Sequence, residues 1–238
     1  MITLIGLTIG FGDRILLSDA DATFAKGSVS ALIGRNGTGK STLLRAMADL
    51  NRDYRGLIEI GGKDMRRLSR NDAARRVAYV STERIRVTNL RCEDVVATGR
   101  APYTGWTGRL QDVDREAVAK ALATVGMTDY ARRTMDTMSD GECQRVMIAR
   151  ALAQSTPAIL LDEPTSFLDM PSRYSLARLL GRLAHDEGKC IIFSTHELDI
   201  ALGMTDTVAL IDPPHLRVMP TSEMKTSGLI ERLFGIDG

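Results

Sequence analysis

A glycine-rich loop at residues 34–41 constrains the fold of this chain more than any other feature. Its sequence, Gly-Arg-Asn-Gly-Thr-Gly-Lys-Ser, matches the pattern G-x-x-x-x-G-K-[ST] at every position. The loop follows a short apolar strand predicted at 29–33. It precedes a predicted helix with an apolar side formed by Leu43, Leu44, Met47 and Leu50. A strand, this loop and a helix in that order indicate an α/β fold that binds a nucleotide.

The residue types in this loop predict how it would hold the nucleotide. Glycines let backbone N–H groups converge on phosphate oxygens, and the positive end of the following helix attracts the same anion. We expect Lys40 to reach the β- and γ-phosphates and the Ser41 hydroxyl to ligate Mg²⁺. The loop alone does not distinguish kinases, GTPases and transport ATPases. Its predicted ATP-binding residues are Gly34, Asn36, Gly37, Thr38, Gly39, Lys40, Ser41 and Thr42.

A pair of carboxylates at the end of a second apolar run points to the same chemistry. Residues 158–161 read Ala-Ile-Leu-Leu and lead directly into Asp162 and Glu163. Two acids at the end of a buried strand are costly unless a cation accompanies them, and α/β sheets bind ligands at that edge. We therefore predict that Asp162 holds Mg²⁺ through water. Glu163 is predicted to act as the general base on the attacking water.

The order of the remaining segments predicts the architecture. Short apolar runs at 77–80, 158–161 and 190–193 alternate with helices, including one at about 172–187, which indicates a parallel sheet covered on both faces. The first 30 residues favour short strands joined by turns. Residues from about 84 to 147 favour helices, with clear helical periodicity at 113–125.

Composition excludes several classes of protein. Hydrophobic residues make up 44% and the net charge is +1, which is typical of a soluble globular protein and predicts no binding to nucleic acid. No apolar run approaches the roughly 18 residues of a membrane-spanning helix, and the N-terminus lacks the basic start of a signal peptide. The three cysteines fit neither a disulfide framework nor a zinc site, so we expect a cytoplasmic protein.

A third motif makes the prediction more specific. Residues 138–145 read Met-Ser-Asp-Gly-Glu-Cys-Gln-Arg and stand between the glycine loop and the carboxylate pair. They resemble the signature sequence of ATP-binding-cassette (ABC) ATPases. The same residues form a capping box, Ser139-x-x-Glu142, and the two interpretations are compatible. In that family this helix start faces the γ-phosphate bound by the other subunit. The resemblance therefore implies that Ser139, Gly141 and Glu142 contact the partner's ATP.

Further segments match the family in order. Residues 166–169 resemble the loop that crosses the dimer interface, which assigns Asp169 to it. Residues 194–197 resemble the switch-histidine segment, which makes His196 catalytic beside Glu163 and Lys40. Phe11 stands where the family places an aromatic ring against adenine. The segment 93–103, with its Gly-Arg-x-Pro sequence, is similar to cassettes of iron-siderophore, heme and cobalamin importers.

Two positions depart from the family pattern. Thr82 stands where a glutamine normally follows the strand at 77–80, and a threonine is too short to reach Mg²⁺ and the lytic water in its place. Glu83 is the neighbouring candidate for that role in the coupling loop. Asp140 replaces the first glycine of the signature, where its charge would repel a triphosphate unless it points away. These changes concern turnover and coupling.

The resemblance, which covers essentially the whole chain, carries a full set of expectations. It implies one domain over 1–238, with a RecA-like P-loop NTPase core at about 1–83 and 148–238, an N-terminal antiparallel β part, and a helical subdomain at about 84–147. It implies ATP and Mg²⁺ as cofactors. The implied partners are a second copy of the chain, integral membrane permease subunits and an extracytoplasmic substrate-binding protein. The chain would lie on the inner face of the cell membrane.

Other possibilities remain open at this stage. A soluble ABC ATPase of DNA repair or translation would share the motifs, although 34–41 and 138–145 lie too close for a long coiled coil and there is only one cassette. A P-loop kinase would not explain Ser139 or His196. The arginine-rich stretch from Lys63 to Arg100 fits a solvated face, a docking surface for a membrane subunit, or contact with anionic lipid headgroups.

Overall fold

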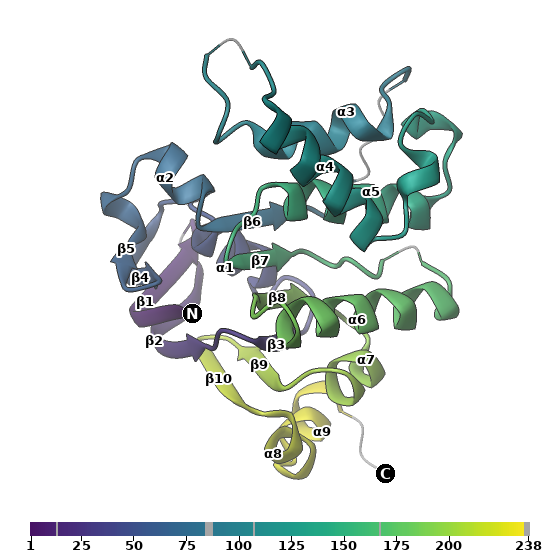
Figure 1. Ribbon diagram of the computed structural model, residues 1–238. Coiled ribbons are helices and arrows are strands. Elements are labelled where there is room, and N and C mark those ends of the chain that lie inside the picture. The colour runs from purple at the N-terminus through teal and green to yellow at the C-terminus, as the bar shows by residue number, and fades with distance from the viewer. Residues whose placement is uncertain (13, 84–87, 107, 167, 236–238) are drawn as a thin grey trace.

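The computed structural model describes residues 1–12, 14–83, 88–106, 108–166 and 168–235. The first strands form an antiparallel sheet, as the sequence predicted. Its order is β2-β1-β4-β5, and its strands are β1 (Ile2–Phe11), β2 (Arg14–Phe24), β4 (Tyr54–Ile60) and β5 (Lys63–Asp64). β1 pairs with both β2 and β4. The bent antiparallel part lies beside the central sheet in Figure 1.

The central sheet has six strands, and all except the edge strand β10 run parallel. Across the sheet they are β10 (His215–Pro220), β9 (Thr207–Asp212), β3 (Ser28–Gly34), β8 (Cys190–Ser194), β7 (Ala158–Leu161) and β6 (Val77–Val80). Alternate residues of each strand enter different cores. In β7, Ile159 and Leu161 pack into one core, while Ala158 and Leu160 pack into the other. Both faces are therefore covered, which explains the continuous apolar runs.

Helices complete both cores. Leu43, Leu44 and Met47 of α1 (Lys40–Met47) pack against the antiparallel strands, whereas α6 (Met170–His185) and α7 (Leu198–Gly203) cover the opposite face. One detail of the predicted α1 is wrong. Asp49 turns the chain with a φ of +61°, so the helix stops early and Leu50 is 63% exposed. Two short helices, α8 (Thr221–Thr226) and α9 (Leu229–Phe234), end the described chain.

The predicted helical region is present and stands at one end of the central sheet (Figure 1). Its main helices are α3 (Cys92–Ala97), α4 (Asp112–Thr124) and α5 (Asp140–Ala153), and a short helix α2 (Arg70–Ala74) precedes β6. Helix α5 runs without a break across residue 147, so the boundary between core and helical subdomain stays a prediction. In the part of the chain that the structure covers, no helix has both the length and the apolar character needed to cross a membrane.

A buried ion pair ties the helical region together. Arg100 Nε lies 2.8 Å from Asp114 Oδ1 of α4, and Arg100 Nη1 donates to the carbonyl of Ala153 at the end of α5. Asp114 also accepts from the backbone N–H of Gln111, and these two contacts lower the pKa of its carboxyl. Arg100 and Gly99 belong to the segment that resembles importer cassettes. That segment therefore has a structural role here: it joins α3, α4 and α5.

Replacing Gly99 is expected to disturb this junction. A Cβ at Gly99 would overlap the carbonyl oxygen of Arg150, which belongs to the backbone of α5 and cannot move aside cheaply. We expect Gly99→Ala to lower the free energy of unfolding by about 1–3 kcal/mol, as overpacking does. Gly181→Ala is the control, because that helical glycine faces open space and the change is expected to stabilise by roughly 0.4–1 kcal/mol. Urea unfolding of both variants measures the difference; equal midpoints would contradict the close packing at Gly99.

Candidate active site

The glycine loop begins at the carboxyl end of β3 and closes around Lys40. Gly37 and Gly39 have backbone φ values of +72° and +104°, which residues other than glycine rarely adopt. Lys40 is buried, and its Nζ donates to the carbonyls of Gly34 at 2.9 Å and Arg35 at 3.2 Å. Burial lowers the pKa of Lys40, although the carboxylates of Glu163 and Asp162 oppose this. The ammonium group is thus held in place beside two acids.

A cavity of about 370 Å³ opens over this loop. Most of the predicted phosphate-binding residues and all three predicted catalytic residues, Lys40, Glu163 and His196, meet in it. Its lining consists of Arg14, Leu16, Asn36, Gly37, Gly39, Lys40, Ser41, Thr42, Glu163 and His196. Gly34 and Thr38 are buried and do not line the cavity: Thr38 Oγ1 donates to the Arg35 carbonyl, and a Cβ at Gly34 would lie 2.7 Å from the Ile211 carbonyl oxygen.

Asp162 is surrounded by three hydroxyl donors. It follows β7, and its Oδ1 accepts from Ser41 Oγ at 3.0 Å and from Ser194 Oγ at 2.7 Å. Its Oδ2 accepts from Tyr79 Oη at 3.1 Å, and burial raises the pKa of Tyr79 to about 12. The sequence prediction missed Ser194 and Tyr79. Each of these residues places a hydroxyl on an otherwise apolar strand next to β7. Their closeness to Asp162 can be recognised only once the strand order is known.

The oxygen atoms of Ser41 and Asp162 fit the magnesium site predicted from the sequence. Mg²⁺ takes hard oxygen ligands and usually combines one or two protein groups with phosphate oxygens and water. The two side chains already lie within hydrogen-bond distance of each other. Within the described part of the chain, no group of three or more His, Cys, Asp or Glu residues could hold a metal by itself. The site therefore suits a metal that arrives with a nucleotide.

Glu163 is held in a strained conformation beside His196. Its φ is +47°, which costs a non-glycine residue on the order of 1–3 kcal/mol. Its backbone N–H donates to Ser194 Oγ at 2.8 Å. His196 Nε2 lies 2.6 Å from Glu163 Oε1, and Ser166 Oγ donates to Oε2 at 3.1 Å. Both carboxylate oxygens are oriented, and the group lines the cavity above Lys40.

The signature segment starts α5 away from this cavity. Ser139 and Glu142 form the predicted capping box: Glu142 Oε2 accepts from the Ser139 backbone N–H at 2.8 Å, and Ser139 Oγ accepts from the Glu142 backbone N–H at 3.3 Å. The first of these contacts lowers the pKa of Glu142. Neither residue is among those that line the cavity over Lys40, nor is Gly141. A Cβ at Gly141 would touch the side chain of Leu168, so the signature helix packs on the loop before α6.

The structure describes the backbone of four other predicted residues: Asp169, Thr82, Glu83 and Phe11. Asp169 caps α6, because its Oδ1 accepts from the Ser172 backbone N–H at 3.1 Å; residue 167 of the same loop lies outside the described residues. Thr82 is half-buried and Glu83 exposed in a bend after β6. Phe11 ends β1, where its backbone pairs with Arg14, but its side chain is not described, so its contact with adenine stays a prediction.

Known proteins that resemble this chain belong to one family. The profile of the ABC transporter family matches residues 17–166. The iron(3+)-hydroxamate import ATP-binding protein FhuC of Bacillus subtilis is 35% identical over 97% of this chain and 86% of its own length. The cobalamin import ATP-binding protein BtuD of Halobacterium salinarum is 35% identical over 87% of this chain and 51% of its own length.

A solved structure gives the same result in three dimensions. A metal-chelate type ABC transporter in an inward-facing conformation superposes with a TM-score of 0.87 at 26% identity, covering 98% of this chain and 88% of the other. The predicted α/β class, with its antiparallel β part and helical region, is confirmed. The matched profile includes the glycine loop, the signature segment and the carboxylate pair. The chain therefore belongs to the ABC transporter family, as an ATP-binding subunit with ATPase activity.

Proposed function

We propose that this chain is the ATPase subunit of an importer for iron-siderophore compounds, with cobalamin and heme as the related alternatives. The meeting of Lys40, Ser41, Asp162, Glu163 and His196 around one cavity carries the proposal for ATP hydrolysis. The names of the relatives support the type of transported compound. The proposal would be contradicted if the chain acts as a soluble ABC ATPase without a membrane partner.

Each residue has a defined part in the proposed hydrolysis. Lys40 and the N–H groups of the loop bind the β- and γ-phosphates, while Ser41 and Asp162 would hold Mg²⁺, which would neutralise phosphate charge. Glu163 accepts a proton from the attacking water, because its carboxylate faces the cavity and lies next to the phosphate-binding loop. His196 Nε2 orients Glu163 through the 2.6 Å contact with Oε1.

We infer that two copies of the chain complete each ATP site. Ser139 is exposed and Gly141 and Glu142 are half-buried at the start of α5, and none of them lines this chain's own cavity, so a role toward ATP requires a second copy. The positive end of α5 is suited to a phosphate. Asp169 begins the helix that packs beside this segment. Thr82 and Glu83 follow β6 and are proposed to link the nucleotide to the helical region.

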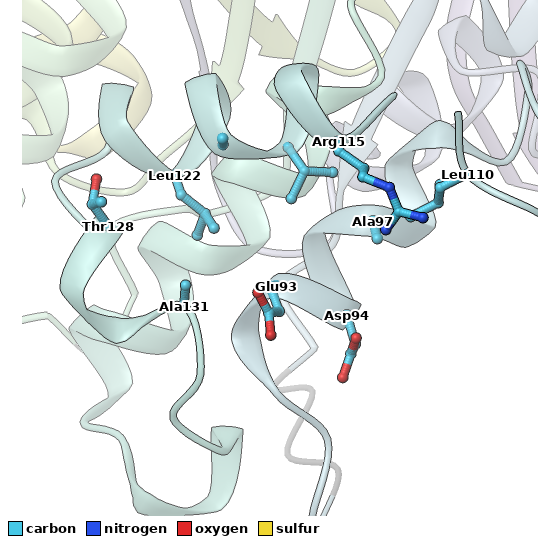
Figure 2. A pocket seen from close by; sticks show the side chains of 10 residues that line it. Glu93, Asp94, Ala97, Leu110, Arg115, Leu122, Thr128 and Ala131 are labelled. Atoms are coloured by element: carbon cyan, nitrogen blue, oxygen red, sulfur yellow. The ribbon is translucent and has the colours of Figure 1, made fainter. Parts of the chain in front are cut away.

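A cavity in the helical region offers a place for the membrane partner. It measures about 390 Å³ and lies between α3 and α4. Its floor includes Ala97, Val118 and Leu122, and Figure 2 shows the carboxylates of Glu93 and Asp94 together at its edge on α3. An apolar floor with a charged rim is typical of a protein-binding pocket. We propose that a cytoplasmic segment of a membrane permease docks here, which would place the chain on the inner face of the membrane. An extracytoplasmic substrate-binding protein would deliver the compound.

Blocking this cavity is expected to release the membrane partner. Ala119 is an exposed residue of α4 that lines the cavity, and Ala119→Arg would place a long charged side chain in it. The tagged wild-type chain should co-purify with a polytopic membrane protein from detergent extracts, and the variant should lose it while hydrolysing ATP normally. Ala123→Arg is the control, because Ala123 is exposed on the same helix but is not part of the cavity lining.

The captured complex also tests the transported compound. In proteoliposomes with ATP inside, it should accumulate a radiolabelled ferric hydroxamate; preferential uptake of cobalamin or heme would select an alternative. Failure of the wild-type chain to capture any polytopic protein would favour a soluble ATPase instead.

A further inference from the structure

Asp162 is held by a hydroxyl to which the sequence analysis assigned no role. Tyr79 lies on β6, the edge strand next to β7, and its Oη donates to Asp162 Oδ2 at 3.1 Å. Ser41 and Ser194 both donate to the other oxygen, Oδ1. Hydrogen bonds therefore fix both oxygens of this carboxylate. Two of them reach Oδ1, and among the described contacts Tyr79 alone reaches Oδ2.

Arg45 lies beside this hydrogen bond. The exposed guanidinium of Arg45, in the last turn of α1, interacts electrostatically with the Tyr79 hydroxyl. A carboxylate only accepts hydrogen bonds, so the Tyr79 hydroxyl is the donor to Asp162. A guanidinium has donors and no acceptor, so it favours the orientation in which the lone pairs of Tyr79 Oη face Arg45 and the hydroxyl proton faces Asp162.

We propose that Tyr79 is a positioning residue that orients Asp162 toward Mg²⁺, and that Arg45 holds the Tyr79 hydroxyl as the donor. This inference rests on the proposed function, in which Asp162 holds the metal. Partners behind a ligand typically change metal affinity or activity by about 10–100-fold when they are removed, because they set the orientation of the ligating group.

The fold does not depend on the Tyr79 hydroxyl. Tyr79 pairs with Leu160 in the β6–β7 ladder, and its carbonyl accepts from Arg150 Nη2 at 3.1 Å. These backbone contacts and the packing of the ring survive in Tyr79→Phe. The variant therefore removes only the hydroxyl, so an effect on metal binding can be separated from an effect on folding.

The test uses Mn²⁺ as a spectroscopic substitute for Mg²⁺ and a non-hydrolysable ATP analogue, so that no turnover is needed. Electron paramagnetic resonance measures free Mn²⁺ during titration of the full chain. Tyr79→Phe is expected to raise the Mn²⁺ Kd about 10-fold or more, while the Kd of the analogue measured without metal stays unchanged. Arg45→Met should weaken Mn²⁺ binding in the same direction, and Arg45→Lys, which is also a pure donor, should restore part of it.

Two controls separate the possible failures. Tyr174→Phe removes another tyrosine–aspartate hydrogen bond, from Tyr174 Oη to Asp199 Oδ2 at 2.8 Å, and should leave the Mn²⁺ Kd unchanged. Asp162→Asn tests the metal site itself. If Asp162→Asn weakens Mn²⁺ binding but Tyr79→Phe equals the wild type, the role of Tyr79 is overturned and the proposed function stands. If Asp162→Asn has no effect, the proposed metal site fails. Should Tyr79→Phe not fold, the exposed Arg45→Met decides the question.

Discussion

ATP hydrolysis by the Glu163→Gln variant is expected to fall by about 10²–10⁴-fold, the contribution of a positioned general base. The amide keeps the shape of the side chain and can still hydrogen-bond to Ser166 and His196, but it cannot accept a proton from water. ATP affinity should be retained, because the phosphates are bound by the loop at 34–41. Single-turnover hydrolysis and a fluorescent ATP analogue measure the two quantities on the purified chain.

A matched variant separates the base from its surroundings. Ser166→Ala removes the 3.1 Å hydrogen bond to Glu163 Oε2 but leaves the carboxylate and His196 in place. It should therefore reduce hydrolysis far less than Glu163→Gln does. Near-normal hydrolysis by Glu163→Gln would remove Glu163 from the role of base.

The second large effect is on dimerisation: the ATP-dependent dimer should be lost when Ser139 is replaced by aspartate. In the Glu163→Gln background, Mg-ATP is expected to convert monomers to dimers, and light scattering detects the change in mass. Aspartate is as good a helix N-cap as serine, so Ser139→Asp should keep the start of α5 intact. Its negative charge would repel a phosphate on the partner, so the dimer should be lost.

Ser139→Arg completes this comparison. Arginine is a poor cap, so this variant should lose about 1 kcal/mol of stability in addition to the dimer. The decisive observation is Ser139→Asp: if it dimerises with Mg-ATP as the parent does, Ser139 is a capping residue only. The capping box seen here would then be the complete explanation of this part of the signature.

The sequence predicted the elements of this protein well where the signal is local. The glycine loop, the apolar strand runs and the capping box each lie within a few consecutive residues, so spacing alone reveals them, and the structure places them as expected. Local patterns predicted the ends of helices less well. The helix after the loop was extended to Leu50 on apolar periodicity, but the turn at Asp49 ends it sooner. The capping of α6 by Asp169 was missed, because the resemblance had assigned that residue to an interface.

What the sequence alone supplied is a prediction of which residues carry the chemistry: Lys40, Ser41, Asp162, Glu163 and His196 follow from motifs, and the structure brings them together. What only the tertiary structure decided is how they are held. Ser194 and Tyr79 reach Asp162 from the strands on either side of β7, and that neighbourhood depends on the strand order β3-β8-β7-β6. Strand order is set by packing and crossover connections between distant segments, and no short pattern encodes it. The hydrogen bonds that orient the predicted metal ligand therefore became visible only in the folded chain.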